Sequence, residues 1–289
     1  MSDPESTIPP TEPIAIADAR DPRVAAFRDI RERELAARTG LFVGETIIVL
    51  EAMLARPEAV QAILASPRML ARVRELVAAS GCRAPLYTAS DEILEELTGI
   101  DLHRGILATG ARAPFEACSP AEFLASPRAT PARTILVAED ITNIDNIGQL
   151  FRIAAAFAAD AVLLSPTCHD PLYRKSLRVS IGHALRVPAI RATRWPDDLV
   201  DLRAATGAEI VATAIQSSVP LGDVARAHEA RPPRAVAIVV GHESKGVSAE
   251  VRAVADHIVR IPMAEGVDSL NVAVSAAIAL DRLSLGARR

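Results

Sequence analysis

The feature that most constrains the fold of this chain is a series of short, continuously apolar segments in its C-terminal half. They are rich in residues that favour strands and lie at 135–138, 161–164, 210–214, 236–240 and 257–261. A strand that is apolar at every position is buried on both faces, as in parallel sheets covered by helices. Helical patterns lie between several of these segments, notably at 147–158, and another follows the last at 272–283. We therefore predict an α/β fold with a mostly parallel sheet and helices on both faces.

Composition narrows the class of protein further. Half of the 289 residues are hydrophobic but only nine are aromatic, so the core is expected to be aliphatic. No apolar run reaches the roughly 18 residues that cross a bilayer, and the N-terminus lacks the pattern of a signal peptide. Cys82, Cys118 and Cys168 are far apart and show neither zinc-ligand spacing nor a disulfide framework. We expect a cytoplasmic protein without a metal site.

The chain is predicted to have four regions. Residues 1–20 are polar and rich in proline, which is typical of a disordered leader. Residues 21–112 read as a small α/β unit, with helices at 21–38, 46–55, 67–80 and 91–98 and strands at 41–43, 60–64, 85–87 and 106–109. Proline-rich residues 113–132 are interpreted as a linker, and 133–289 form the second domain.

Three polar segments follow predicted strands, at the sheet edge where open parallel sheets bind ligands. The first contains Asn146 and Arg152. Asn146 is predicted to cap a helix that begins at Ile147, while Arg152 would reach a phosphate or a developing oxyanion. Taken alone, this segment is better explained by an ordinary helix cap and a surface arginine.

The other two segments contain glycines that allow close approach to a ligand. Gly241 and Gly246 bracket a turn that holds Glu243, but neither the GxxxxGK[ST] phosphate loop nor the GxGxxG dinucleotide pattern is present. In the third segment, Pro262 ends strand pairing, and Ser269 and Asn271 are suitable N-cap residues. The second segment, taken alone, is better explained by an ordinary strand-to-helix turn with solvated charges. The third fits equally a plain helix N-terminus and a compact pocket for a small ligand.

Together the three segments resemble a known family. The order Asn146-x-Gly148-x3-Arg152, Gly241-x-Glu243-x2-Gly246, then Ile261-Pro-Met263 and Ser269-Leu-Asn271 resembles the signature motifs of the SpoU/TrmH family, the ribose-methylating branch of the SPOUT methyltransferases. The resemblance covers about residues 134–283. Residues 22–112 are similar to the family's small substrate-binding domain of L30e-like fold, mainly at 41–45 and 103–108.

This resemblance implies a homodimer, a C-terminal trefoil knot, which is rare among folds, and S-adenosylmethionine as cofactor. The positions that match the cofactor site are Val240, Gly241, Ile261, Met263, Ser269, Leu270 and Asn271. Those that match catalytic positions are Asn146, Arg152, Glu243, Ser269 and Asn271. The chain departs from the family pattern at Thr46 and Ala158, where glycine is usual, and at His242, where Asn or Ser is more common.

RNA is the expected partner, although a net charge of −4 argues mildly against a polyanion ligand. Candidate RNA contacts are Arg104, Arg174, Lys175, Arg178, Ser180 and His183. The extra N-terminal domain favours ribosomal over transfer RNA by resemblance alone. Three alternatives remain open: a non-catalytic RNA-binding or ribosome-assembly protein, a base methyltransferase, and a nicotinamide-dependent oxidoreductase, which the missing glycine pattern disfavours.

Overall fold

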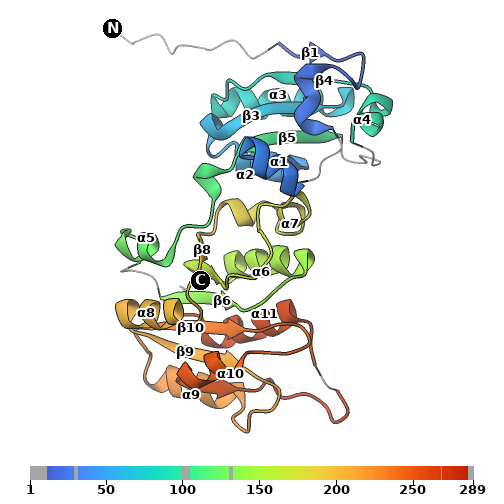
Figure 1. Cartoon of the computed structure of the whole chain (residues 1–289). Helices are drawn as coiled ribbons and strands as arrows, with labels where there is room; N and C mark the ends of the chain where they lie inside the picture. Colours follow the sequence, from blue (N-terminus) through green and yellow to red (C-terminus); the bar gives the residue numbers. More distant parts are fainter. Residues whose placement is uncertain (1–11, 29–31, 99–104, 130–132, 268, 286–289) are drawn as a thin grey trace. The chain divides into compact units, whose positions relative to one another are not determined.

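A computed structural model of the chain describes residues 12–28, 32–98, 105–129, 133–267 and 269–285. The chain divides into two compact units (Figure 1). The first contains Met1–Glu116 together with Leu172–Leu185, and the second contains Ala117–Pro171 together with Arg186–Arg289. The sequence boundaries at 112 and 133 did not anticipate that residues 172–185 belong with the first unit. Among the described residues, no helix is long and apolar enough to span a membrane.

The second unit is built on six parallel strands. They are β6 (Thr134–Ala138), β7 (Ala161–Leu164), β8 (Ala189–Arg191), β9 (Ala208–Thr213), β10 (Ala235–Val240) and β11 (His257–Val259). Their order is β11-β9-β10-β6-β7-β8, and every neighbouring pair is parallel. The chain runs outward from β6 to β8, then crosses to the other half of the sheet, so that β10 lies beside β6. This is the point of reversal at which such sheets bind ligands.

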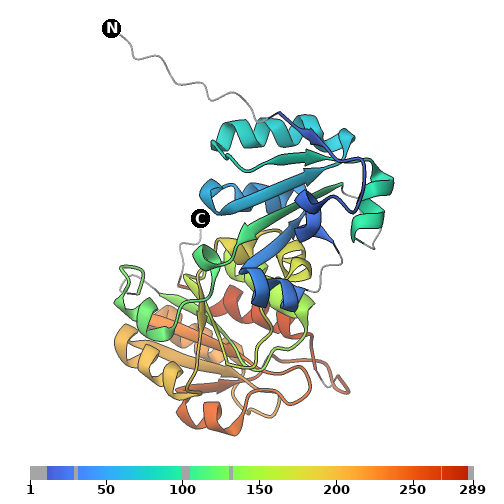
Figure 2. The ribbon, with the colours of Figure 1, turned by 45° about the horizontal axis from the view of Figure 1, so that its top comes forward.

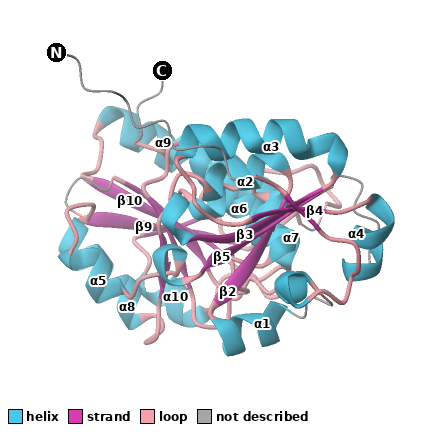
Figure 3. Ribbon diagram, turned by 90° about the horizontal axis from the view of Figure 1, so that it is seen from above, coloured by secondary structure: helices cyan, strands magenta, loops and turns pink. Residues whose placement is uncertain are grey.

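Helices cover both faces of this sheet, which explains why its strands are apolar at consecutive positions. One face carries α6 (Ile144–Ala156), α9 (Leu221–Ala230) and α11 (Val272–Leu283), and the other carries α5 (Pro120–Ala125), α8 (Asp197–Thr206) and α10 (Ala249–Val254). Figure 3 shows α9 on one side of β9 and β10 and α5, α8 and α10 on the other. Ile135 and Val137 pack toward α5 and α8, while Leu136 between them is buried on the opposite face. The predicted α/β fold is confirmed.

The first unit has a five-stranded mixed sheet (Figure 2). Its strands, in spatial order, are β1 (Ile14–Ala15), β4 (Leu86–Thr88), β3 (Val60–Ala65), β5 (Ile106–Ala111) and β2 (Leu41–Glu45), with β5 antiparallel to its neighbours. The helices are α1 (Glu32–Thr39), α2 (Ile47–Met53), α3 (Pro67–Ser80), α4 (Asp91–Thr98) and α7 (Arg174–Val179), with short 3-10 turns at Pro22–Phe27, Pro57–Ala59, Ala113–Phe115 and His183–Leu185. An L30e-like fold for this unit and a knot in the second stay predictions.

Two predicted regions differ from the structure. The leader was expected to extend to residue 20, but Ile16 and Ala19 are buried in the first unit's core and residues 14–15 form β1; residues 1–11 lie outside the described part. The predicted linker contains α5, whose Phe123 is buried. There the proline that suggested a loop, Pro120, occupies the first helical turn, where proline is favoured, and a Ser119–Glu122 capping box completes the N-terminus.

The helix predicted over 21–38 is also interrupted. A 3-10 turn covers Pro22–Phe27, and Arg28 then takes an extended backbone conformation that a helix does not permit. α1 begins only at Glu32. Arg28 donates hydrogen bonds to the carbonyl oxygen of Ala19, at 2.8 Å from one guanidinium nitrogen, which ties this extended residue to the preceding loop.

Backbone geometry explains why glycine is usual at two positions where this chain has another residue. Thr46 has a φ of 88° and Ala158 has a φ of 52°. Residues with a side chain rarely adopt such positive φ values, whereas glycine does so without steric cost. A glycine is therefore the easier residue at both positions. Thr46 offsets part of its strain, because its hydroxyl accepts a hydrogen bond from the Val49 amide at the start of α2.

Candidate functional site

A cavity of about 380 Å³ lies beyond the carboxyl ends of β9, β10 and β11. Its lining comes from the segments that follow these strands and from the start of α11. The lining residues include six of the predicted cofactor positions, namely Val240, Gly241, Ile261, Met263, Ser269 and Leu270. They also include residues that sequence reasoning missed, among them Thr213, Gln216 and Arg252. The order of strands in the sheet decides which loops meet, so the sequence motifs could not predict that the loop after β9 lines the cavity.

The glycine loop after β10 is folded tightly on itself. A Cβ atom on Gly241 would lie 2.4 Å from the carbonyl carbon of Gly246 and from the amide nitrogen of Val247, so no side chain fits there. Gly246 has a φ of +69° and donates its amide hydrogen to the carbonyl oxygen of His242 at 2.8 Å. His242 Nδ1 accepts hydrogen bonds from the amides of Ser244 and Lys245. His242 thus supplies the acceptor that an Asn or Ser would otherwise provide in this turn.

Glu139 anchors the far end of the same loop, and the sequence motifs did not identify this role. Its side chain is buried at the end of β6, with 2% exposed. One carboxylate oxygen accepts hydrogen bonds from Trp195 Nε1 at 2.7 Å and Ser248 Oγ at 2.6 Å, and the other accepts the Ser248 amide at 2.8 Å. Since Ser248 also caps α10, Glu139 joins β6 to the end of the glycine loop.

Three of the predicted catalytic side chains form a hydrogen-bonded chain. Asn271 Nδ2 donates to Asn146 Oδ1 at 3.0 Å, and Asn146 Nδ2 donates to Glu243 Oε1 at 2.7 Å. Asn271 Oδ1 accepts from the Ala273 amide at the start of α11. These partners are separated by 125 and 97 positions in the sequence. The structure therefore brings Asn146, Glu243 and Asn271 together at the edge of the cavity, which Glu243 lines.

The predicted capping role of Asn146 is wrong. The cap of α6 is Asn143, whose Oδ1 accepts hydrogen bonds from the amides of Asp145 and Asn146, and the helix begins at Ile144. Both asparagines can cap a helix, and an N-terminus three residues earlier left no local indication in the sequence. The consequence is functional: because Asn143 satisfies the helix amides, the buried side chain of Asn146 is available to Glu243 and Asn271.

The remaining two predicted catalytic residues are not part of this chain of hydrogen bonds. Ser269 is exposed and lines the cavity. Arg152 lies in α6 with an exposed side chain, and no described residue forms a hydrogen bond or ion pair with its guanidinium. A cationic group with no internal partner can bind an anionic ligand without first breaking a salt bridge.

The predicted RNA contacts in the first unit differ in how far their side chains are exposed and in their partners. Arg174 and Arg178 of α7 approach Oε2 of the buried Glu45, at 3.9 and 3.4 Å, while Lys175 is exposed. Ser180 is fully buried, and its hydroxyl donates to the Leu177 carbonyl and accepts from the Ala184 amide. Direct contact between Ser180 and RNA is therefore excluded in this conformation; the residue stabilises the turn before the half-buried His183. Arg104 lies outside the described residues.

Cys168, close to the ends of β6 and β7, has a structural environment. Burial raises the pKa of its thiol, and Sγ lies 3.2 Å from the carbonyl oxygen of Ala138, to which it donates. The Ile141 amide in turn donates to Sγ at 3.4 Å. A buried, protonated thiol is a poor nucleophile, so we assign Cys168 no part in the chemistry.

Comparison with known proteins gives a consistent result. The sequence profile of the SpoU rRNA Methylase family matches residues 133–281. An uncharacterised tRNA/rRNA methyltransferase of Mycobacterium tuberculosis (strain ATCC 25618 / H37Rv) is 37% identical over 271 residues, which cover 91% of this chain and 89% of that protein.

Solved structures with a similar fold span nearly the whole chain. One described as an RNA 2′-O ribose methyltransferase is 26% identical with a TM-score of 0.71, covering 94% of this chain and 98% of its own. An AdoMet-bound rRNA methyltransferase from Sinorhizobium meliloti has a TM-score of 0.76 at 19% identity, covering 93% and 96% of the two chains. The SpoU methyltransferase AviRb from Streptomyces viridochromogenes has a TM-score of 0.71 at 22% identity, covering 90% and 93%. At these last two identities the similarity concerns the fold alone.

Proposed function

The chain belongs to the SpoU rRNA Methylase family and is an RNA methyltransferase, and from this premise we propose that it methylates a ribose 2′-hydroxyl with S-adenosylmethionine as donor. The observation that carries the proposal is the hydrogen-bonded set Asn146, Glu243 and Asn271 at the edge of a cavity at the carboxyl ends of parallel strands. The similarity to an RNA 2′-O ribose methyltransferase over 94% of the chain supports the ribose target.

The cavity has the properties that the donor molecule requires. Its volume of about 380 Å³ falls within the roughly 300–1,000 Å³ range of small-molecule sites. The lining includes Glu243, Lys245 and Arg252, so side chains of both charges are available for a ligand that carries a sulfonium, an amino group and a carboxylate. The tight turn at Gly241 exposes backbone groups rather than a side chain. We propose that Val240, Gly241, Ile261, Met263, Ser269, Leu270 and Asn271 hold this ligand, which when bound supplies an electrophilic methyl group.

The residues at the cavity edge would position the substrate hydroxyl. Asn271 fixes the amide of Asn146, which in turn holds one oxygen of Glu243. The other oxygen of Glu243 has no partner among the described residues, so it is available to accept a hydrogen bond from a ribose hydroxyl. Orienting two reactants in this way can be worth about 7–11 kcal/mol of the barrier.

Arg152 would act on the negative charge of the substrate. A guanidinium has a pKa above about 12 and is a poor base, so we propose that Arg152 binds a phosphate of the RNA and stabilises the developing alkoxide. Its side chain is exposed and has no hydrogen-bond or ion-pair partner within the described part of the chain, which supports this role. Lysine provides one point of charge where arginine provides two parallel donors, and this difference can be tested.

We further propose that the protein is a homodimer and that its first unit binds RNA, through Lys175, Arg174, Arg178, His183 and Arg104. Ribosomal RNA is the preferred substrate, because the chain has an N-terminal unit in addition to the family domain. Glu45 lies between Arg174 and Arg178 and would hold both guanidinium groups in place before RNA binds.

The test is methyl transfer from labelled S-adenosylmethionine to total RNA that lacks the modification. We expect label in one RNA band with the wild type, a loss of about 100-fold or more with Arg152→Ala, and a partial loss with Arg152→Lys. Nuclease digestion and mass spectrometry of the product should identify a 2′-O-methylated nucleoside. A methylated base would refute the ribose target, and full turnover by Arg152→Lys would refute the bidentate role.

The non-catalytic alternative makes a different prediction for the donor. A folded protein that binds RNA but shows no calorimetric binding of S-adenosylmethionine would be an RNA-binding protein that has lost turnover. The intact set Asn146, Glu243 and Asn271 favours the enzyme.

A further inference from the structure

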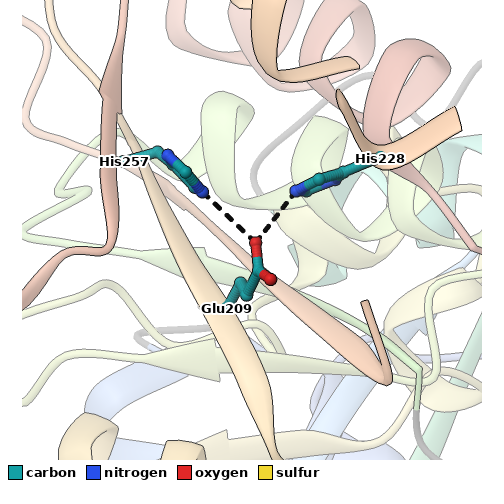
Figure 4. Close-up of side chains that lie close together, drawn as sticks. All are labelled: Glu209, His228 and His257. Atoms are coloured by element: carbon teal, nitrogen blue, oxygen red, sulfur yellow. Dashed lines mark hydrogen bonds and ion pairs between the residues drawn. The ribbon is translucent and has the colours of Figure 1, made fainter. Parts of the chain in front are cut away.

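A second cluster of polar side chains lies in the second unit, at the ends of the strands opposite to the cavity. Glu209 is near the start of β9, His257 is the first residue of β11, and His228 is in the last turn of α9. The cavity adjoins the carboxyl ends of these strands, whereas this cluster adjoins their amino ends. Figure 4 shows that both imidazole rings point toward one carboxylate oxygen of Glu209.

The three side chains converge at distances typical of ligands around one ion. Glu209 Oε2 lies 3.0 Å from His228 Nε2 and 3.2 Å from His257 Nε2. The three atoms all lie within 4.8 Å of one another. Zinc bonds of about 2.0–2.1 Å at tetrahedral angles separate neighbouring ligand atoms by about 3.3 Å. Both glutamate–histidine distances are within a few tenths of an ångström of this value. The two imidazole nitrogens, which lie within 4.8 Å of each other, would adjust to the same separation when an ion binds.

We propose that Glu209, His228 and His257 form a binding site for a divalent transition metal ion, with zinc as the best match. Two imidazole nitrogens and one carboxylate oxygen are donors that suit zinc, and three protein ligands leave a fourth position for water. The side chains of Glu209 and His257 are 41% and 39% exposed, so an ion can enter from solvent. The spacing of these residues along the chain, 19 and 48 positions from Glu209, explains why no sequence motif indicated a metal site.

The charged residues next to the cluster do not compete with Glu209, His228 and His257 for a metal ion. Asp256 precedes His257, but its carboxylate is occupied by the Ile210 amide at 2.8 Å and by Arg203 at 3.2 Å. Within the described ranges, no arginine or lysine forms an ion pair with Glu209. The carboxylate of Glu209 is therefore not engaged by a neighbouring cationic side chain of the described residues and can contact a metal ion.

One feature limits the expected affinity. His228 is 92% buried, and its Nδ1 has no hydrogen-bond partner among the described residues. When Nε2 binds a metal, Nδ1 carries the proton, and such nitrogens usually donate it to an acceptor; loss of that partner weakens binding about 10–100-fold. We therefore expect zinc to bind about 10–100-fold more weakly than at a site with complete outer contacts.

The metal would connect β9, β11 and α9, and the segments that follow β9 and β11 line the cavity. β9 and β11 are neighbours in the sheet, and α9 packs on β11. β11 leads within four residues of His257 to Ile261, which lines the cavity. Because the cluster lies at the other end of these strands, the ion is expected to stabilise the fold and to take no part in methyl transfer.

The experiment uses the full-length, tag-free protein after treatment with a chelator. Isothermal titration with Zn²⁺ should show one ion per chain, and the thermal midpoint should rise with Zn²⁺ concentration, as ligand binding to the native state requires. Co²⁺ should give the visible absorption of a four-coordinate site with nitrogen and oxygen ligands, without the thiolate band that binding to the cysteines would produce.

Variants identify the ligands. Glu209→Gln and His257→Gln, at half-exposed positions, should each reduce zinc affinity at least tenfold while the protein stays folded; His228→Gln should do the same unless burial prevents folding. His169→Gln removes an imidazole outside the cluster and should leave binding unchanged. Absence of saturable zinc binding, or binding that Glu209→Gln and His257→Gln do not weaken, overturns the proposal. The cluster would then be a hydrogen-bonded contact between α9, β9 and β11.

Discussion

Asn271 combines a structural and a positioning task in a single side chain. Its oxygen caps α11 by accepting the Ala273 amide, so its NH₂ group is left to face Asn146. This fixes the orientation of the Asn146 amide, whose own NH₂ group then faces Glu243. The direction of the whole chain of hydrogen bonds thus follows from a helix cap, because an amide has one donor end and one acceptor end.

The substitution Asn271→Asp separates these two tasks. Aspartate still caps α11, but it presents an oxygen to Asn146 Oδ1 in place of a donor. We expect methyl transfer to fall about tenfold, the value of one lost hydrogen bond, while the thermal midpoint stays near that of the wild type. The matched control is Asn143→Asp, which keeps the cap of α6 outside the hydrogen-bonded set. Equal losses of rate in both variants would contradict the positioning role.

At the scale of elements, the end of β6 determines the shape of the loop after β10. Glu139 receives three hydrogen bonds, from Trp195 Nε1 and from the amide and hydroxyl of Ser248. All three groups are donors, so both carboxylate oxygens act only as acceptors. The loop that holds Gly241 and Glu243 follows β10, and its far end is thereby fixed by Glu139 at the end of β6, the neighbouring strand in the sheet.

Glu139→Gln should therefore be harmful although it preserves size. The new NH₂ group would face a donor in a buried site, which costs about 1–3 kcal/mol. We expect a lower thermal midpoint and weaker binding of S-adenosylmethionine, measured by calorimetry. Glu122→Gln, at the capping box of α5, should affect stability without changing the affinity for the donor. Unchanged binding by Glu139→Gln would show that the loop keeps its shape without this anchor.

At the scale of the whole molecule, the chain does not complete one unit before it begins the next. After β7 it contributes residues 172–185 to the first unit and then returns to form β8. Gly182 makes this return tight: its φ is +79°, and a Cβ atom would lie 2.7 Å from Cβ of Ala52 in α2. Lys175 and the arginines of α7 belong to this same segment.

Gly182→Ala should displace the segment from α2. We expect lower methylation of RNA, while the affinity for S-adenosylmethionine changes less than twofold, since the cavity is lined by the second unit. The control Gly207→Ala has a similar φ of +70° but meets only the flexible side chain of Arg234. It should cost about 1–2 kcal/mol of backbone strain and leave RNA methylation intact. An equal loss of donor affinity in Gly182→Ala would argue against the division of tasks between the units.

Local patterns in the sequence were sufficient for most of the strands, for several helices and for the class of fold. Continuous apolar segments indicated the buried strands, and helices such as α3, α4 and α11 have the bounds that periodicity and caps predicted. The loops after β10 and β11 could be recognised as cavity-lining because glycine, proline and capping residues act on the backbone within a few positions. Such effects are short-range, so they are visible in the sequence itself.

The tertiary structure alone decided which distant residues meet. Strand order places β10 beside β6, brings Asn146 to Glu243 and Asn271 across 97 and 125 positions, and assembles Glu209 with two histidines. The cap of α6 was misplaced for a related reason, since Asn143 and Asn146 are equivalent by local preference and only the hydrogen bonds of Asn146 to distant side chains distinguish them. Contacts between remote segments depend on the packing of whole elements, which leaves no periodic pattern along the chain.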